Sequence, residues 1–323
     1  MDNFKKAIAA LTAIISMASL GVGTISASAA DLDAINEKIL NDTASNEEKF
    51  IAEYANDSEE MKVAEYVINS GISLCDAESL MSSYEIGLAN ANFTETFSDD
   101  GDTVINLNTQ FYNDSNLSKK QHYLVFVADD GSAQFRTSFI VSYDNRRIGF
   151  DEDADVSLLN KNSKTFLNFD QTSDISANRS ALSFGGRYVK ENDQAIPKGF
   201  AEIPFNILVD PTTAIGKAYS ERRVRNDISI TDIQNTTING GIDSILSSGT
   251  YVLGDFDHDG KVTETDTTYI LKIVVGTYKG IKFHYTSEES DDYAKILTYL
   301  AADTDKDGNL TVADAVWMNK NRD

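Results

Sequence analysis

One acidic pattern occurs twice near the end of this chain and constrains its fold more than any other feature. Four aspartates and a glycine recur in the same order and spacing: Asp255, Asp257, Asp259, Gly260 and Asp266, then Asp303, Asp305, Asp307, Gly308 and Asp314. Carboxylates at alternate loop positions, with glycine at the sixth position for a sharp turn, are typical of a calcium loop of the EF-hand kind. The pattern therefore predicts two calcium ions, each held by a loop that leads into a helix.

Such a loop takes its ligands from positions 1, 3, 5, 7, 9 and 12, and the seventh position supplies a backbone carbonyl. These positions are Asp255, Asp257, Asp259, Lys261, Thr263 and Asp266 in the first copy, and Asp303, Asp305, Asp307, Asn309, Thr311 and Asp314 in the second. A single loop of this kind with a structural calcium is common in surface proteins. Two copies in register favour a paired module instead.

The eighth position of each loop is apolar, Val262 in the first and Leu310 in the second. This predicts that the two loops meet back to back through a short strand-like contact. Apolar residues at helical spacing follow each loop, for example Tyr269 with Ile273 and Val274 in the first copy. One helix is therefore expected after each loop, and no entering helix is needed.

The segment from Gly254 to Asp323 resembles the dockerin module of cellulosome proteins, which has Asp at the twelfth position and lacks the entering helix. The resemblance implies a small all-α, calcium-folded domain (residues 251–323) that binds a cohesin module of a scaffolding protein. It also implies which residues contact the cohesin: Glu264, Thr265, Lys272, Val312, Ala313 and Lys320. Because the residue pairs before the two closing aspartates differ, a single binding orientation is expected.

An insertion separates the two repeats, from Gly276 to Ala302. Its second part, Glu288 to Leu300, has apolar residues at helical spacing, which predicts an extra helix. Packing of this helix against the repeat pair is the favoured interpretation, and contact with a partner or a neighbouring domain is the alternative.

The first 30 residues have the features of a secretory signal peptide: two lysines, an apolar stretch from Ala7 to Val22 and small residues before Asp31. We therefore expect a secreted, extracellular protein without a membrane span. The single cysteine, Cys75, excludes an internal disulfide, so packing and calcium must stabilise the fold. A formal charge of −23 argues against nucleic acid and anionic membranes as partners.

Residues 31–250 are long enough for one full core and predict an α+β module, either one domain or a helical portion joined to a β portion. Capping signals at Ser45, Asp57 and Ser73 predict helices first. Period-two patterns then predict antiparallel strands at 103–112, 122–128, 133–143, 181–189, 200–209 and 224–233, with a hairpin turn at 129–131. The polar stretch 151–180 is expected to be a long loop.

The activity of this module is left open. Cys75 and His122, followed by Asp144 or Asn145, are the residue types of a papain-like peptidase, but Cys75 has no preceding Gln for an oxyanion hole. Candidate carboxylates for glycoside hydrolysis are Glu85, Glu95, Asp144 and Glu202, each more often a solvated side chain than a catalyst. The favoured hypothesis is an accessory component of a cellulosome-type complex that breaks down polysaccharide. A hydrolase on the same tether, either a glycosidase or a cysteine peptidase, is the alternative, and a carbohydrate ligand is left open.

Overall fold

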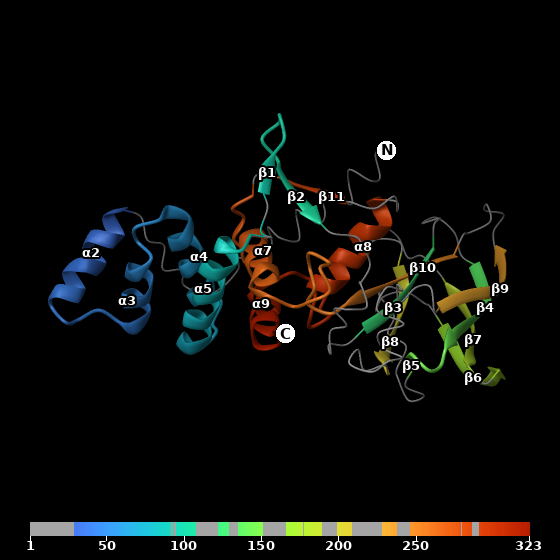
Figure 1. The fold of residues 1–323 in the computed structure, drawn as a ribbon. Helices are drawn as coiled ribbons and strands as arrows, with labels where there is room; N and C mark the ends of the chain where they lie inside the picture. Colours follow the sequence, from blue (N-terminus) through green and yellow to red (C-terminus); the bar gives the residue numbers. More distant parts are fainter. Residues whose placement is uncertain are drawn as a thin grey trace. The chain divides into compact units, whose positions relative to one another are not determined.

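The computed structural model describes residues 29–91, 93, 95–107, 122–128, 135–150, 166–176, 178–188, 199–208, 228–237, 246–278, 280–285 and 291–323 (Figure 1). These residues fall into two compact units, and each unit takes segments that are far apart in the sequence. The helical unit contains the described residues of 9–106, 262–284 and 302–323. The β unit contains those of 107–261 and 285–301.

The helical unit begins with four helices: α2 (Ala29–Leu40), α3 (Asn46–Glu53), α4 (Ser58–Asn69) and α5 (Leu74–Ala89). The predicted caps are present. Ser45 and Glu48 form a reciprocal capping box, while Asp57 and Ser73 accept hydrogen bonds from the first turns of α4 and α5. These interactions satisfy backbone N–H groups that have no partner within the helix, and so they fix where each helix begins.

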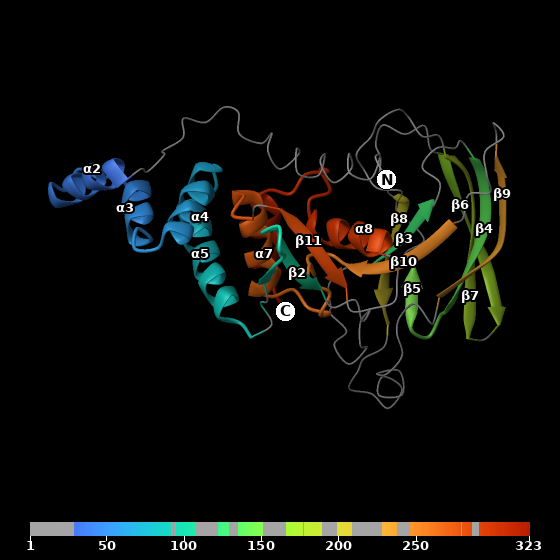
Figure 2. The same ribbon diagram turned by 90° about the horizontal axis from the view of Figure 1, so that it is seen from above.

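Two further helices of the helical unit, α7 (Glu264–Val275) and α9 (Val312–Lys320), follow the two acidic loops. Helix α5 packs on α4, α7 and α9, and α7 also packs on α9 (Figures 1 and 2). The core of this unit is formed by fully buried side chains such as Val67, Leu80, Tyr84, Ile270 and Met318. A small sheet of β1 (Glu95–Phe97), β2 (Thr103–Leu107) and β11 (Ile281–Tyr285) completes the unit.

The β unit consists of two four-stranded sheets and helix α8 (Asp291–Ala302). One sheet has the order β10-β3-β8-β5, from β3 (His122–Ala128), β5 (Ile148–Phe150), β8 (Gly199–Ile207) and β10 (Leu246–Val252). The other has the order β6-β7-β4-β9, from β4 (Phe135–Asp144), β6 (Phe166–Ser176), β7 (Arg179–Tyr188) and β9 (Ile228–Thr237). Neighbouring strands pair antiparallel in both sheets.

Aromatic side chains connect the two sheets, which face each other in Figure 2. Tyr143 on β4 contacts Phe150 on β5 with ring centroids 4.9 Å apart, and Phe150 contacts Phe205 on β8 at 5.6 Å. Val141 and Phe205 are fully buried, so the core of the β unit lies between the sheets.

The predicted α+β class, with helices first and antiparallel strands after them, is confirmed. The long loop predicted at 151–180 is wrong, because 166–176 form β6 and β7 begins at Arg179. β6 is polar in sequence and lies at a sheet edge, where one side has no strand partner, so it lacks the apolar pattern of a central strand. The all-α expectation for 251–323 is also wrong in one respect, since this region contains β11.

Helix α2 was not predicted, and the grouping of segments differs from the predicted modules. The sequence predicts that 31–250 form one domain, or a helical portion joined to a β portion, whereas α2 to α5 belong to the same unit as α7 and α9. The signal peptide, except for its last two residues, and the hairpin turn at 129–131 lie outside the described residues. Within the described part of the chain, every helix is too short or too polar to span a membrane.

Candidate calcium loops

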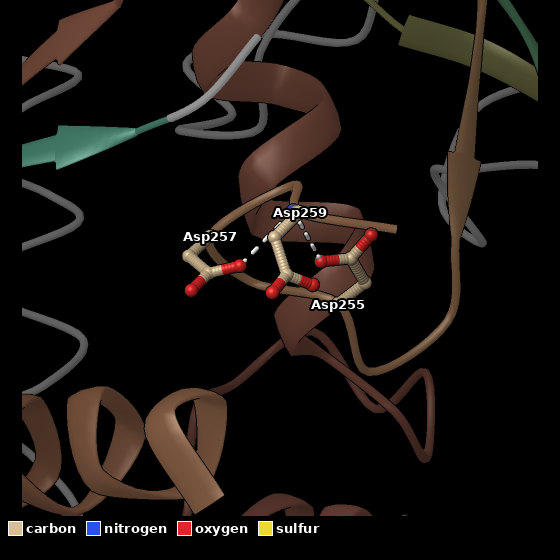
Figure 3. Close-up of side chains that lie close together, drawn as sticks. All are labelled: Asp255, Asp257 and Asp259. Carbon is tan, nitrogen blue, oxygen red and sulfur yellow. Dashed lines mark hydrogen bonds between the residues drawn. The ribbon is translucent and has the colours of Figure 1, made fainter. Parts of the chain in front are cut away.

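Each acidic loop brings three carboxyl groups together. The carboxylate oxygens of Asp255, Asp257 and Asp259 lie within 4.8 Å of one another, and Figure 3 shows the three side chains converging inside the first loop. Asp303, Asp305 and Asp307 form the equivalent cluster in the second loop. Both clusters could therefore hold a metal ion, as the sequence predicts.

The two loops share one hydrogen-bond network. In the first, the N–H of Asp259 donates to Oδ1 of Asp255 (3.1 Å) and to Oδ1 of Asp257 (3.0 Å), and the N–H of Gly260 donates to Oδ2 of Asp255 (3.0 Å). The same three bonds recur in the second loop at 3.1, 3.1 and 3.0 Å, between Asp307, Asp303, Asp305 and Gly308. The repeat seen in the sequence therefore extends to the orientation of each carboxylate.

The backbone conformation is also duplicated. The sixth position has φ of 92° at Gly260 and 89° at Gly308, the left-handed region that glycine enters without a steric cost. A Cβ atom on Gly308 would meet nothing within 4 Å, so backbone strain and not crowding requires glycine there. The fourth position is left-handed as well, at His258 (φ 59°) and Lys306 (φ 60°). The sequence does not predict this feature, because a positive φ is uncommon for residues other than glycine, although histidine adopts it more often than most.

The last two ligand positions of each loop also cap the following helix. Thr311 is the N-cap of α9, and Oδ2 of Asp314 accepts from the N–H of Thr311 (2.8 Å). Thr263 and Asp266 form the same capping box at the start of α7, with a bond of 2.8 Å. Asp266 and Asp314 are both fully buried. In each copy, the same two side chains therefore hold both the end of the loop and the start of the following helix in place.

Burial, together with neighbouring negative charges, raises the pKa of several carboxyl groups. Burial, followed by the negative charge of Asp259, raises the pKa of Asp257 to about 7. In the second loop, burial followed by the charge of Asp314 raises the pKa of Asp303 to about 7. Burial likewise raises the pKa of Asp314. A bound divalent cation offsets this repulsion, and the all-oxygen donor set fits calcium, which prefers hard oxygen ligands.

Helix α8 packs on the first loop. Nε2 of His258 lies 2.8 Å from Oγ1 of Thr298 on α8, and the N–H of Gly254 donates to the carbonyl of Ala301 at 2.8 Å. Burial lowers the pKa of His258 to about 4, so its ring is neutral at pH 7. The predicted extra helix in the insertion is thus confirmed, and so is its packing against the repeat region.

The predicted back-to-back contact between the loops is wrong. The backbone of Val262 pairs with Asp323 instead: its N–H donates to Oδ2 of Asp323 (2.8 Å), and its carbonyl accepts from the N–H of Asp323 (3.0 Å). No strand bridge is assigned at Val262 or at Leu310. Asp323 therefore bonds to the N–H and carbonyl groups of Val262, which were expected to contact the second loop.

Three of the six residues implied as cohesin contacts form ion pairs within the helical unit. Lys272 is buried, and its Nζ lies 2.9 Å from Glu59 and 2.8 Å from Glu95. The other five positions are as follows: Thr265 and Val312 are buried, Ala313 is exposed, Lys320 pairs with Asp76 at 2.6 Å, and Glu264 pairs with Arg322. In this conformation the side chains of Thr265 and Lys272 do not face solvent.

The candidate catalytic residues are placed individually. Cys75 is exposed in the first turn of α5, in the helical unit, while His122 is buried at the start of β3, in the β unit. Among the carboxylates, Glu85 is exposed, Glu95 accepts from Tyr278, Glu202 accepts from Tyr251 at 2.5 Å, and Asp144 pairs with Arg146 at 2.6 Å. Asn145 donates to Ser180 at 3.1 Å. Cys75 and His122 therefore belong to different units.

Comparison with known proteins adds no relative: no protein-family model, no curated protein and no solved structure matches this chain. The dockerin resemblance therefore rests on the sequence of the two loops.

Proposed function

We propose that this chain binds two calcium ions, one in each loop, and that the loop and helix pair is a dockerin-type module that attaches the protein to a cohesin of a scaffolding protein. The observation that carries the calcium proposal is the identical network in the two loops, in which the third aspartate and the glycine orient the first two carboxylates. Because the two loops repeat the same hydrogen bonds to the same carboxylates, we infer that both bind the same kind of ion.

Calcium is favoured over magnesium by the number and kind of donors. Each loop offers four carboxylates, a backbone carbonyl and a hydroxyl, which suits the six to eight oxygen ligands of calcium. Magnesium demands a near-ideal octahedron and usually keeps several waters. In this proposal the closing ligands are Asp266 and Asp314, while Lys261 and Asn309 contribute their carbonyls. The ion supplies charge neutralisation and folding energy, not catalysis.

Attachment to a cohesin follows from the dockerin resemblance, with the signal peptide placing the protein outside the cell as part of a cellulosome-type complex. The six implied contact positions surround the starts and ends of α7 and α9. Several of them have partners in the chain itself, so the attachment requires a rearrangement of these side chains.

Isothermal titration with calcium tests the first part of the proposal. We expect a stoichiometry of two for the full chain, and one for either Asp257→Ala or Asp305→Ala. Asp33→Ala on α2 is the matched control, because Asp33 is an exposed aspartate outside both loops. A stoichiometry that is unchanged in both loop variants, or equal affinity for magnesium, contradicts the assignment.

Capture on a panel of immobilised, purified cohesin modules tests the second part. We expect at least one cohesin to retain the chain in calcium and to release it in a chelator. Failure of all cohesins, with two calcium ions bound, would leave the metal sites standing and refute the attachment.

A further inference from the structure

Helix α5 lies against α7 at a point where only glycine fits. A Cβ atom added to Gly87 would lie 2.0 Å from Oγ1 of Thr268 and 2.5 Å from the backbone oxygen of Glu264. The hydroxyl of Thr268 also donates to the carbonyl of Tyr84, at 3.3 Å. A backbone oxygen cannot rotate out of the way as a side chain can. The sequence of α5 is therefore fitted to the surface of α7.

The same face of α5 contacts α9 through polar side chains. Oγ of Ser83 donates to Oδ1 of Asn319 (2.6 Å), and Nδ2 of Asn319 donates to Oγ of Ser79 (2.8 Å). Near the start of α5, Asp76 forms an ion pair of 2.6 Å with Lys320. Positions 76, 79, 83 and 87 follow one stripe of a helix, so α5 meets α9 and α7 with a single surface.

Both lysines that the resemblance implies as partner contacts are neutralised by acidic residues from the N-terminal part of the helical unit. Lys320 pairs with Asp76 of α5, and Lys272 pairs with Glu59 of α4 and Glu95 of β1. Lys272 also lies over the rings of Phe93 and Tyr278, at 5.4 Å from each centroid. These partners supply both the negative charge and the aromatic surface that an external protein would otherwise provide.

We infer that α5, together with α4 and β1, is an internal ligand for the surface formed by α7 and α9, and that it holds this surface closed to external proteins. This inference rests on the proposed attachment for the identity of the competing partner. The stripe itself is polar, whereas Leu80 and Tyr84 of the same helix are fully buried in the core of the helical unit, so the form in which α5 has separated is a minor one. Binding of a cohesin to α7 and α9 then requires that α5 leaves first, so the population of the open form limits the apparent affinity.

Hydrogen exchange of the full chain in saturating calcium tests closure without any partner. Gly87→Ala improves the intrinsic helix propensity of α5 but places a methyl group against the backbone of α7. Ser82→Ala is the matched control, because it makes a similar gain in propensity on the exposed side of the same helix. We expect exchange in α7 and α9 to be at least tenfold faster in Gly87→Ala than in Ser82→Ala. Equal exchange in the two variants overturns the inference.

A crosslink tests the competition. Ser83→Cys and Asn319→Cys are introduced in a Cys75→Ser background and joined by oxidation or by a short thiol-reactive linker. We expect the linked protein to bind purified cohesins at least tenfold more weakly than the unlinked one, and Gly87→Ala to bind more tightly than Ser82→Ala. Equal cohesin binding by linked and unlinked protein overturns the inference.

The two failures remain distinguishable. If no cohesin binds any variant, including Gly87→Ala, the proposed attachment is refuted, and the exchange experiment alone decides whether α5 closes the surface. If a cohesin binds but neither the crosslink nor Gly87→Ala alters its affinity, the attachment stands and the internal ligand is refuted.

Discussion

Replacement of Glu95 by Gln is expected to destabilise the helical unit more than replacement of its partner Lys272 by Met. The side chain of Lys272 is 7% exposed, and that of Glu95 is 16% exposed. Removal of one partner from a buried ion pair costs about 3–5 kcal/mol, because the other charge is left without compensation. Here Glu59 still lies 2.9 Å from Lys272, so we expect a smaller loss for Glu95→Gln, about 2 kcal/mol.

Lys272→Met removes the buried cation together with its desolvation penalty. The methionine side chain retains apolar contact with the rings of Phe93 and Tyr278. Glu95 still accepts a hydrogen bond from Tyr278, and the side chain of Glu59 is 44% exposed and can be solvated. We therefore expect a change of less than about 1 kcal/mol. The double variant should be more stable than Glu95→Gln alone, because it no longer contains a buried cation that has lost one of its two carboxylate partners.

Urea unfolding in saturating calcium measures these differences. Trp317 is the only tryptophan in the chain and lies on α9, so its fluorescence reports on the helical unit. Glu85→Gln on the exposed side of α5 is the control for loss of an acidic side chain. The reasoning fails if Lys272→Met costs as much as Glu95→Gln, since the ion pair would then contribute net stability of its own.

Three further predictions concern the loops and the end of the chain. Gly308→Ala should weaken calcium binding by about tenfold, because a left-handed alanine costs about 1–2 kcal/mol; calorimetry measures this, and an unchanged affinity refutes it. Because the folded pKa values of Asp257 and Asp303 are raised to about 7, the native state without calcium binds more protons than the unfolded state between about pH 4 and pH 7. Its stability should therefore rise as the pH falls from 7.5 to 5.5, whereas the increase in melting temperature caused by calcium should shrink, as calorimetric scans with calcium or chelator can show. Finally, Asp323→Ala should cost about 1 kcal/mol in urea unfolding, because the buried N–H of Val262 loses its side-chain acceptor; no loss means that water replaces the bond.

Local signals in the sequence predicted local structure well. The capping residues Ser45 and Asp57 mark helix starts that the structure contains, since both act through bonds within a few residues. The acidic positions of the loops were also predictable, because the ion dictates ligand spacing along a short segment. Each of these features is determined by residues that are close to it in the sequence.

Features that depend on distant segments were not predicted. The sequence around Gly87 does not show that a side chain at this position would clash with the backbone of Glu264. The clash arises only because α5 packs on α7. Likewise, Lys272 looks like a solvated lysine in sequence, but Glu59 and Glu95 make its burial tolerable. The resemblance placed this lysine at an external interface, whereas the fold uses it internally.

The duplication of the loops does not extend to their surroundings, and this limits how similar the two sites can be. The first position is buried in both loops, at Asp255 and Asp303. At the third and fifth positions Asp257 is buried and Asp259 is half-buried, with α8 packed alongside through His258, whereas Asp305 and Asp307 are exposed. A carboxylate in water loses little when its ion leaves, but a buried carboxylate must be protonated or remain charged in a poor solvent. Loss of calcium therefore strains the first loop more than the second, even though their ligands and hydrogen bonds are the same. The two loops repeat in sequence, but the free energy of losing calcium differs between them, because the insertion that forms α8 packs on the first loop.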